Sequence, residues 1–144
     1  TCGAYVPELK LGDVILATRA YTDSNYANVQ SDYKQNYLDT STIINAKIRE
    51  VTKETNNLIE GNIYTTDVFY EGKDYQQIRE KYHVLGVEME TFGLLENARI
   101  LGKNATSILT VSDSFCFAGE LTSEEREKNL NKMIEIALNT GLNL

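Results

Sequence analysis

The stretch Val84-Leu-Gly-Val-Glu-Met-Glu-Thr91 combines the pattern of a buried strand with two carboxylates placed one residue apart at its end. Strands of a parallel sheet are covered on both faces and are apolar along their length, so polar residues belong at the rim. Ligands of open α/β sheets bind in the crevice outside the carboxyl ends of the strands. Glu88 and Glu90 are therefore predicted to lie at such a crevice.

The rest of the chain alternates between strand and helix patterns. The polar run 22–37 reads as a long loop and the segment 69–74 as a turn. This alternation predicts a three-layer α/β/α fold around a central mixed, largely parallel sheet. The expected strands cover 13–20, 58–66, 84–89 and 105–112, and the expected helices cover 40–55, 75–81, 91–101 and 122–139.

Length, charge and cysteine spacing exclude several classes of protein. The 144 residues make about one domain, and the net charge of −7 argues against a nucleic-acid binder. No apolar run approaches the ~18 residues that span a bilayer. Cys2 and Cys116 have the spacing of neither a zinc site nor a disulfide framework. We expect a single cytoplasmic domain that binds neither nucleic acid nor membrane.

The paired glutamates have two interpretations. Two neighbouring carboxylates repel one another and lose hydration unless donors, cations or a ligand surround them. In an extended strand Glu88 and Glu90 point to the same side, where the hydroxyls of a sugar can donate to them. Alternatively, one or both cap the following helix and interact with its dipole. The segment alone leaves both interpretations open.

Asp113 is a candidate general acid. It ends the stretch Ser107-Ile-Leu-Thr-Val-Ser-Asp113, whose apolar side chains would raise the carboxyl pKa and keep a proton available near neutral pH. The alternative is a turn residue bonded to its own backbone. Arg126 lies close to a predicted helix start, where the helix dipole disfavours a cation. It either reaches an anion such as Asp113 or remains solvated.

Two further features carry weaker signals. Phe69 and Tyr70 can stack on a flat ring, but aromatic residues at a strand end more often belong to the core. Glu88, Glu90 and Asp113 have the oxygen donors that Mg²⁺ or Mn²⁺ prefers, yet the sequence has no dedicated oxygen-ligand loop. We therefore expect no metal.

A set of short strings occurs in order along the chain. They are Thr1-Cys-Gly-Ala4, Leu9-Lys-Leu-Gly-Asp-Val-Ile-Leu16, Tyr21-Thr-Asp-Ser24, Asp67-Val-Phe-Tyr70, Leu85-Gly-Val-Glu-Met-Glu90, Thr110-Val-Ser-Asp113 and Thr122-Ser-Glu-Glu-Arg126. Together they resemble the nucleoside phosphorylase superfamily, in particular the bacterial hexameric type of purine nucleoside phosphorylase. The resemblance extends over essentially the whole chain.

The resemblance implies phosphorolysis of purine (deoxy)ribonucleosides to free base and (deoxy)ribose 1-phosphate, as in purine salvage. It implies no cofactor, inorganic phosphate as co-substrate, and a homo-oligomer, namely a hexamer built as a trimer of dimers. It also implies one nucleoside phosphorylase domain over 1–144 that is incomplete at its N-terminus. The family's preceding segment supplies phosphate-binding glycine and arginines and a histidine for a neighbour's ribose. We therefore expect a fragment that is inactive and poorly folded alone.

The resemblance also implies a role for each matching residue. Asp113 would protonate the purine at N7, and Arg126 would assist that transfer. Glu90 would hold the ribose hydroxyls, and the hydroxyl of Thr1 would bind phosphate. The residues that would border the nucleoside are Glu88, Met89, Ser112, Phe69, Val87, Cys2 and Gly3.

Two alternatives remain open at the level of sequence. A methylthioadenosine or adenosylhomocysteine nucleosidase would use similar carboxylates but attack with water. A non-catalytic nucleoside-binding module would keep the crevice without turnover. The Ser123-Glu-Glu-Arg126 string favours the phosphorylase.

Overall fold

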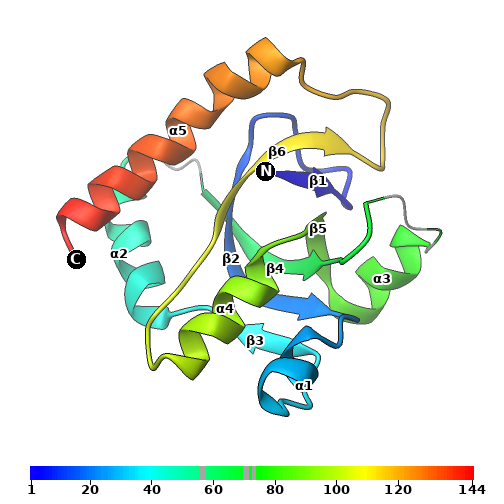
Figure 1. Ribbon diagram of the computed structural model, residues 1–144. Coiled ribbons are helices and arrows are strands. Elements are labelled where there is room, and N and C mark those ends of the chain that lie inside the picture. The colour runs from blue at the N-terminus through cyan, green and yellow to red at the C-terminus, as the bar shows by residue number, and fades with distance from the viewer. Residues whose placement is uncertain (56–57, 70–71, 73) are drawn as a thin grey trace.

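The computed structural model describes residues 1–55, 58–69, 72 and 74–144, and the described residues form six strands and five helices. Figure 1 shows their arrangement. In chain order they are β1 (Cys2–Ala4), β2 (Val14–Thr22), α1 (Tyr26–Ser31), β3 (Tyr37–Asp39), α2 (Thr42–Thr52), β4 (Leu58–Thr65), α3 (Tyr75–Tyr82), β5 (Val84–Glu88), α4 (Thr91–Ile100), β6 (Ile108–Ser114) and α5 (Ser123–Leu142).

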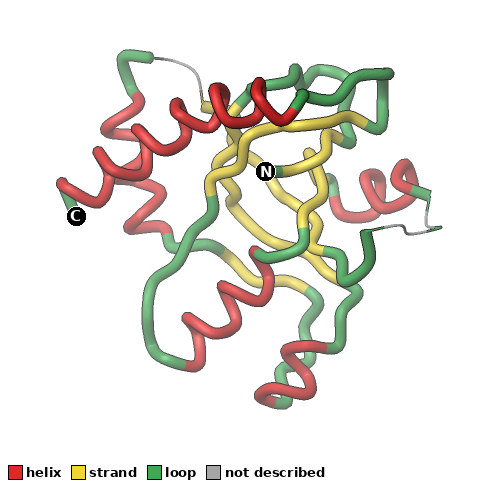
Figure 2. The backbone as a smooth tube through the Cα atoms, turned by 45° about the horizontal axis from the view of Figure 1, so that its top comes forward, coloured by secondary structure: helices red, strands yellow, loops and turns green. Residues whose placement is uncertain are grey.

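The strands form one mixed sheet in the order β3-β2-β4-β5-β1-β6. Pairs β2–β4, β4–β5 and β1–β6 are parallel, whereas β1–β5, β2–β3 and β2–β6 are antiparallel. Because the edge strand β6 also pairs with β2, the sheet curves round and closes on itself between these two strands. Figure 2 shows the sheet surrounded by helices. The predicted α/β class with a mixed sheet is confirmed, and antiparallel pairs are as frequent as parallel ones in the described part.

Successive residues of β2 face opposite layers of helices. Val14 and Leu16 pack in one cluster with Ile48 of α2 and Ile136 of α5. Ile15 and Ala17 belong to a second cluster, which includes Phe92 and Leu95 of α4. Because side chains alternate between the faces of a strand, this one segment anchors both cores. Figure 1 shows α2 and α5 together on one side of the sheet and α3 on the other.

The expected long loop at 22–37 is wrong in part, since it contains α1 and the start of β3. Helix α1 has six residues and buries only Ala27. It therefore lacks the row of apolar residues, three or four positions apart, by which a helix is recognised in a sequence. Tertiary hydrogen bonds hold it instead: Ser31 Oγ bonds Glu96, and the Tyr26 hydroxyl donates to Asn97 Oδ1 at 2.9 Å. The expected turn at 69–74 includes positions 70, 71 and 73, which lie outside the described residues.

The expected helix boundaries rest on identifiable caps. Thr122 and Glu125 form the capping box that their spacing indicates: the Glu125 amide donates to Thr122 Oγ1 at 3.2 Å, and the Thr122 amide donates to Glu125 Oε2 at 2.9 Å. Gly102 follows the end of α4 with φ of 62°, a left-handed conformation that glycine adopts without strain. No helix in the described part of the chain combines the length and apolarity needed to cross a membrane.

Strand β1 is the element that brings the polar strand ends together. It lies between β5 and β6, with Gly3 paired to Val87 on one side and to Asp113 on the other. The neighbouring register places Thr65 of β4 opposite Glu88 of β5. The ends of β4, β5 and β6 therefore converge around Gly3.

Replacing Gly86 with alanine is expected to destabilise this arrangement. A Cβ at Gly86 would lie 2.6 Å from the carbonyl oxygen of Gly3, so the β1–β5 pairing would have to move. We expect Gly86→Ala to lower the free energy of unfolding by about 1–3 kcal/mol in urea denaturation. Gly141→Ala is the control, because its Cβ meets nothing within 4 Å and alanine favours a helix. Equal stability of the two variants would contradict the prediction.

Candidate active site

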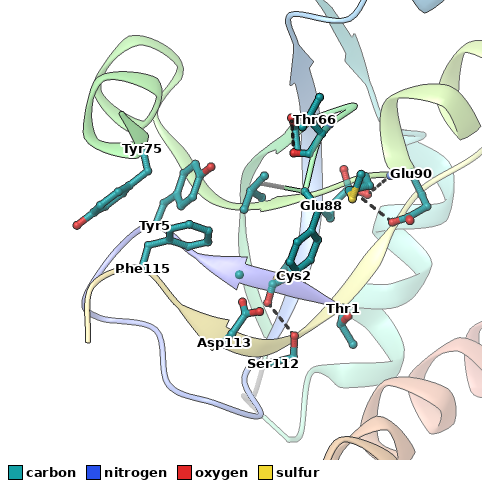
Figure 3. A pocket seen from close by; sticks show the side chains of 15 residues that line it. Thr1, Cys2, Tyr5, Thr66, Tyr75, Glu88, Glu90, Ser112, Asp113 and Phe115 are labelled. Atoms are coloured by element: carbon teal, nitrogen blue, oxygen red, sulfur yellow. Dashed lines mark hydrogen bonds between the residues drawn. The ribbon is translucent and has the colours of Figure 1, made fainter. Parts of the chain in front are cut away.

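A cavity of about 250 Å³ opens where β1, β5 and β6 meet, as Figure 3 shows. It collects nearly all the residues that the sequence singled out, although they come from four separate segments of the chain. The predicted site residues that line it are Thr1, Cys2, Gly3, Phe69, Val87, Glu88, Met89, Glu90, Ser112 and Asp113. Arg126 is not among the described lining residues.

The carboxylate of Glu88 is buried and already occupied by protein donors. One oxygen accepts the Thr65 hydroxyl at 2.5 Å. The other accepts the amides of Glu90 and Thr91, at 2.8 and 2.7 Å, and the Thr91 hydroxyl at 2.8 Å. Glu88 is 5% exposed. The helix-capping alternative therefore holds for Glu88, which ties the end of β4 to the start of α4.

The carboxylate of Glu90 is in the opposite situation. Glu90 is exposed and occupies the position before the first residue of α4, but its side chain makes no capping bond. Among the described residues its carboxylate accepts only the amide of Met89, at 3.2 Å. Glu90 thus keeps acceptor capacity at the cavity. The capping interpretation fits Glu88, and the interpretation as an acceptor for a ligand fits Glu90.

Asp113 is half-buried, and its Oδ1 atom has no hydrogen-bond partner among the described residues. Burial raises its pKa above the ordinary value of an aspartate, and the charge of Arg126 acts in the opposite direction. A Cβ on Gly3 would lie 2.5 Å from Oδ1, so only glycine leaves room for this carboxyl. A carboxyl with a raised pKa and one buried oxygen that no described residue bonds can hold a proton and release it to a bound ligand.

Arg126 does not bond Asp113 in this structure. Its Nε donates to the carbonyl of Leu121 at 3.0 Å, and its guanidinium lies 3.7 Å from Glu120 Oε2. The backbones of Glu120 and Asp113 pair across the loop as an isolated antiparallel β-bridge. Arg126 is therefore held next to the segment that covers Asp113, at a position from which its charge still acts on that carboxyl.

Cys2 and Ser112 contribute to the floor of the cavity. Burial raises the pKa of the Cys2 thiol to about 12, so the thiol stays protonated and is a poor nucleophile. The Ser112 hydroxyl is buried and lies 3.4 Å from the Cys2 carbonyl oxygen, to which it donates. Both residues shape the cavity more than they add reactive groups.

Sequence reasoning missed part of the lining. The Thr66 side chain follows directly after β4, so the rule that ligands gather at strand ends would have found it. Phe115 lies two residues after Asp113 and just beyond β6, and a period of two extended past the strand end would have placed it on the same side as Asp113, which is a usable signal. Tyr5 and Tyr75 give no local signal because a fold is needed to bring them to Phe115. The missed lining residues are Tyr5, Thr66, Val68, Tyr75 and Phe115.

Metal ligands do not gather in the described residues. No group of three or more His, Cys, Asp or Glu side chains in that part of the chain is arranged to hold an ion. Glu88, the most buried acidic group at the cavity, is bonded by hydroxyl and amide donors instead.

The chain matches a family model and named relatives. Residues 1–140 match the model described as the phosphorylase superfamily. A DeoD-type purine nucleoside phosphorylase of Geobacillus sp. (strain WCH70) is 37% identical over 144 residues, and one of Bacillus cereus (strain B4264) is 40% identical over 145 residues. Each alignment covers 99% of this chain and 61% of the relative. The chain thus spans about three fifths of the length of these relatives.

Solved structures share the fold. The 5'-methylthioadenosine/S-adenosyl homocysteine nucleosidase of Campylobacter jejuni superposes with a TM-score of 0.86 at 23% identity, covering all of this chain and 67% of that one. The corresponding Helicobacter pylori protein gives a TM-score of 0.81 at 20% identity, covering all of this chain and 66% of that one. These likenesses confirm the fold, and the family model extends over nearly the whole sequence. The chain belongs to the phosphorylase superfamily.

Proposed function

We propose that this chain carries the nucleoside-binding and proton-donating site of a purine nucleoside phosphorylase. The observation that carries the proposal is the buried Oδ1 of Asp113, which has no partner in the described part of the chain, in a cavity whose other end holds the available carboxylate of Glu90. A nucleoside is a base and a sugar joined by one bond, so a proton donor at one end of the cavity suits the base and a hydrogen-bond acceptor at the other end suits the sugar. The names of the relatives that are 37–40% identical support the same activity.

In the proposed reaction Asp113 gives its proton to N7 of the purine. The bond between N9 and C1' breaks, its electron pair goes to the purine, and the base leaves neutral. A phosphate oxygen then bonds to C1', which has developed oxocarbenium character, and yields (deoxy)ribose 1-phosphate. Asp113, left as a carboxylate, regains its proton from water after the base has departed. Proton donation of this kind typically contributes about 10²–10⁴-fold to the rate.

The two glutamates have different roles in this proposal. The Glu90 carboxylate accepts hydrogen bonds from the ribose hydroxyls, and Met89 packs against the sugar. Glu88 borders the nucleoside but acts through Glu90, because its oxygens are occupied by the donors of α4 and β4. Its bond to the Glu90 amide fixes the backbone from which the clamping side chain extends.

The remaining residues bind the base and phosphate. The exposed Thr1 hydroxyl at the cavity is assigned to phosphate, and Arg126 assists proton transfer by turning from Glu120 towards Asp113. The residues assigned to the faces and edges of the base are Phe69, Val87, Ser112, Cys2 and Gly3.

Phosphate dependence tests the activity itself. We expect a protein that carries this chain together with a complete phosphate site to cleave inosine or adenosine only when phosphate is present, and to release ribose 1-phosphate in amounts equal to the free base. The measurement is base release with and without phosphate, with chromatographic identification of the sugar product. Cleavage at the same rate without phosphate, giving free ribose, would instead identify a hydrolytic nucleosidase.

Replacing Asp113 with asparagine tests the general acid. We expect Asp113→Asn to lower kcat by about 10²–10⁴-fold while nucleoside binding is retained, because asparagine keeps the shape but gives no proton. In the wild type kcat should fall as pH rises through the raised pKa of Asp113, above the ordinary aspartate range. The variant should lack this limb. The exposed helix carboxylate Glu127 provides the control, since Glu127→Gln removes a charge away from the cavity.

The same raised pKa determines how the free energy of unfolding changes with pH. Between the ordinary aspartate pKa and the raised one, the folded protein keeps a proton that the unfolded chain releases. The contribution of Asp113 to the free energy of unfolding therefore falls as pH rises through that window, and Asp113→Asn should remove this dependence.

For the kinetic test, a kcat of Asp113→Asn equal to that of the wild type would show that Asp113 is not the general acid.

The glutamates can be separated by paired substitutions. We expect Glu90→Gln to lower kcat/KM for a ribonucleoside by about tenfold or more, with little effect on a 2',3'-dideoxynucleoside, because a charged acceptor for hydroxyls is lost. Glu88→Gln leaves buried donors without an acceptor and should lower the free energy of unfolding by about 1–3 kcal/mol. A fully stable Glu88→Gln variant that loses hydroxyl discrimination would assign Glu88 to the sugar directly.

A further inference from the structure

One end of the cavity is aromatic and has no part in the proposed proton transfer. Tyr5 and Phe115 meet edge to face with ring centroids 5.0 Å apart. Tyr75 lies 5.4 Å from Tyr5 and 5.7 Å from Phe115. All three side chains line the cavity and are termed the aromatic trio. Tyr5 directly follows β1, Tyr75 begins α3 and Phe115 directly follows β6, so the fold rather than a local motif assembles them.

The trio is anchored in the core but leaves one ring accessible. Tyr5 is 4% exposed and belongs to a buried cluster with Tyr64, whereas Phe115 is 52% exposed. Edge-to-face packing against the buried Tyr5 ring holds Phe115 in place. An accessible aromatic face in a concave site is a surface that a flat apolar group can cover.

Gly3 fixes the trio next to the general acid. A Cβ on Gly3 would lie 2.5 Å from Asp113 Oδ1 and 2.8 Å from Phe115 Cε2, so both groups pack over the same glycine. The Phe115 amide also donates to the carbonyl of Ala4 at 2.9 Å, which continues the strand pairing beyond Asp113. In Figure 3 the trio lies at the left of the cavity, Asp113 at its lower centre and Glu90 at its upper right.

This order determines which part of a bound purine faces the trio. If Glu90 holds the sugar and Asp113 reaches N7, the six-membered ring extends away from the sugar. The exocyclic group at C6 lies beside N7 across the ring fusion, so a substituent there emerges next to Asp113 and points to the trio.

The lining has few groups that can read the edge of the base. No Asn, Gln, His, Lys or Arg is present among the described residues of the cavity wall. Side-chain amides, imidazoles and cations for reading C6 are thus missing from those residues, and the polar groups of the aromatic end are the hydroxyls of Tyr5 and Tyr75. Because most of the surface at this end is aromatic, we expect shape and stacking to dominate selection there.

We propose that the aromatic trio is a subsite for a flat apolar substituent on the C6 exocyclic group of a purine nucleoside, for example the benzyl group of N6-benzyladenosine. The assignment rests on the proposed function, because Asp113 and Glu90 set the orientation of the base. The substituent stacks on Phe115, and Tyr5 and Tyr75 hold that ring.

The kinetic test compares N6-benzyladenosine with adenosine in the presence of phosphate. In the wild type kcat/KM for the benzyl substrate should equal or exceed that for adenosine. Phe115→Ala should lower the benzyl-to-adenosine ratio about fivefold, as expected for loss of one aromatic contact. Phe117→Ala is the matched control: Phe117 is 40% exposed, lies two residues farther along, and is not among the described lining residues. Its ratio should stay at the wild-type value.

A binding test separates the subsite from the reaction. Calorimetry with the free bases N6-benzyladenine and adenine needs neither phosphate nor catalysis. Tighter binding of the benzyl base that is lost in Phe115→Ala supports the subsite, even if no nucleoside is cleaved. A benzyl base that binds no more tightly than adenine, or an unchanged preference in Phe115→Ala, overturns the subsite while leaving the proposed function intact. Absence of cleavage for every nucleoside with phosphate, in a protein that carries this chain and a complete phosphate site, counts against the proposed function alone.

Discussion

The hydrogen bonding of the Glu88 carboxylate is the interaction on which the site depends. This buried group accepts the Thr65 hydroxyl from the end of β4 and two amides and a hydroxyl from the start of α4. A buried charge is tolerated only when donors surround it, so the three elements must meet at this point. Their meeting defines one wall of the cavity and the backbone of Glu90. Glu88 is therefore an architectural residue of the site.

Gly3 imposes the second constraint, on the opposite wall. It is the point where β1 passes between β5 and β6, and any side chain there would collide with Asp113 and Phe115. The Asp113 carboxyl can be pressed against the backbone only because Gly3 has no Cβ. Burial of the carboxyl at this position raises its pKa.

The sequence predicted what depends on strand and helix periodicity. Alternation placed the main strands and helices, and the strand-end rule brought Glu90 and Asp113 to one crevice. It could not tell which glutamate caps α4, because that choice depends on where the amides of Thr91 and its neighbours lie in three dimensions. Helix α1 escaped detection because the hydrogen bond between Ser31 and Glu96 joins residues 65 positions apart. The pairing of Arg126 with Glu120 is likewise a property of the folded loop.

The division of labour among the three carboxyl groups follows from their surroundings. Glu88 is saturated with donors, Glu90 is exposed with spare acceptor capacity, and Asp113 is partly buried without a partner for one oxygen among the described residues. Donors stabilise a charged carboxylate, whereas burial without donors favours the protonated form. Three chemically similar side chains at the ends of the two strands that flank β1 are therefore suited to the different roles proposed for them, namely an anchor, an acceptor and a proton donor. The proposed cleavage of a glycosidic bond requires the last two to differ, and they do differ in their surroundings, since Glu90 is exposed whereas the Oδ1 atom of Asp113 is buried.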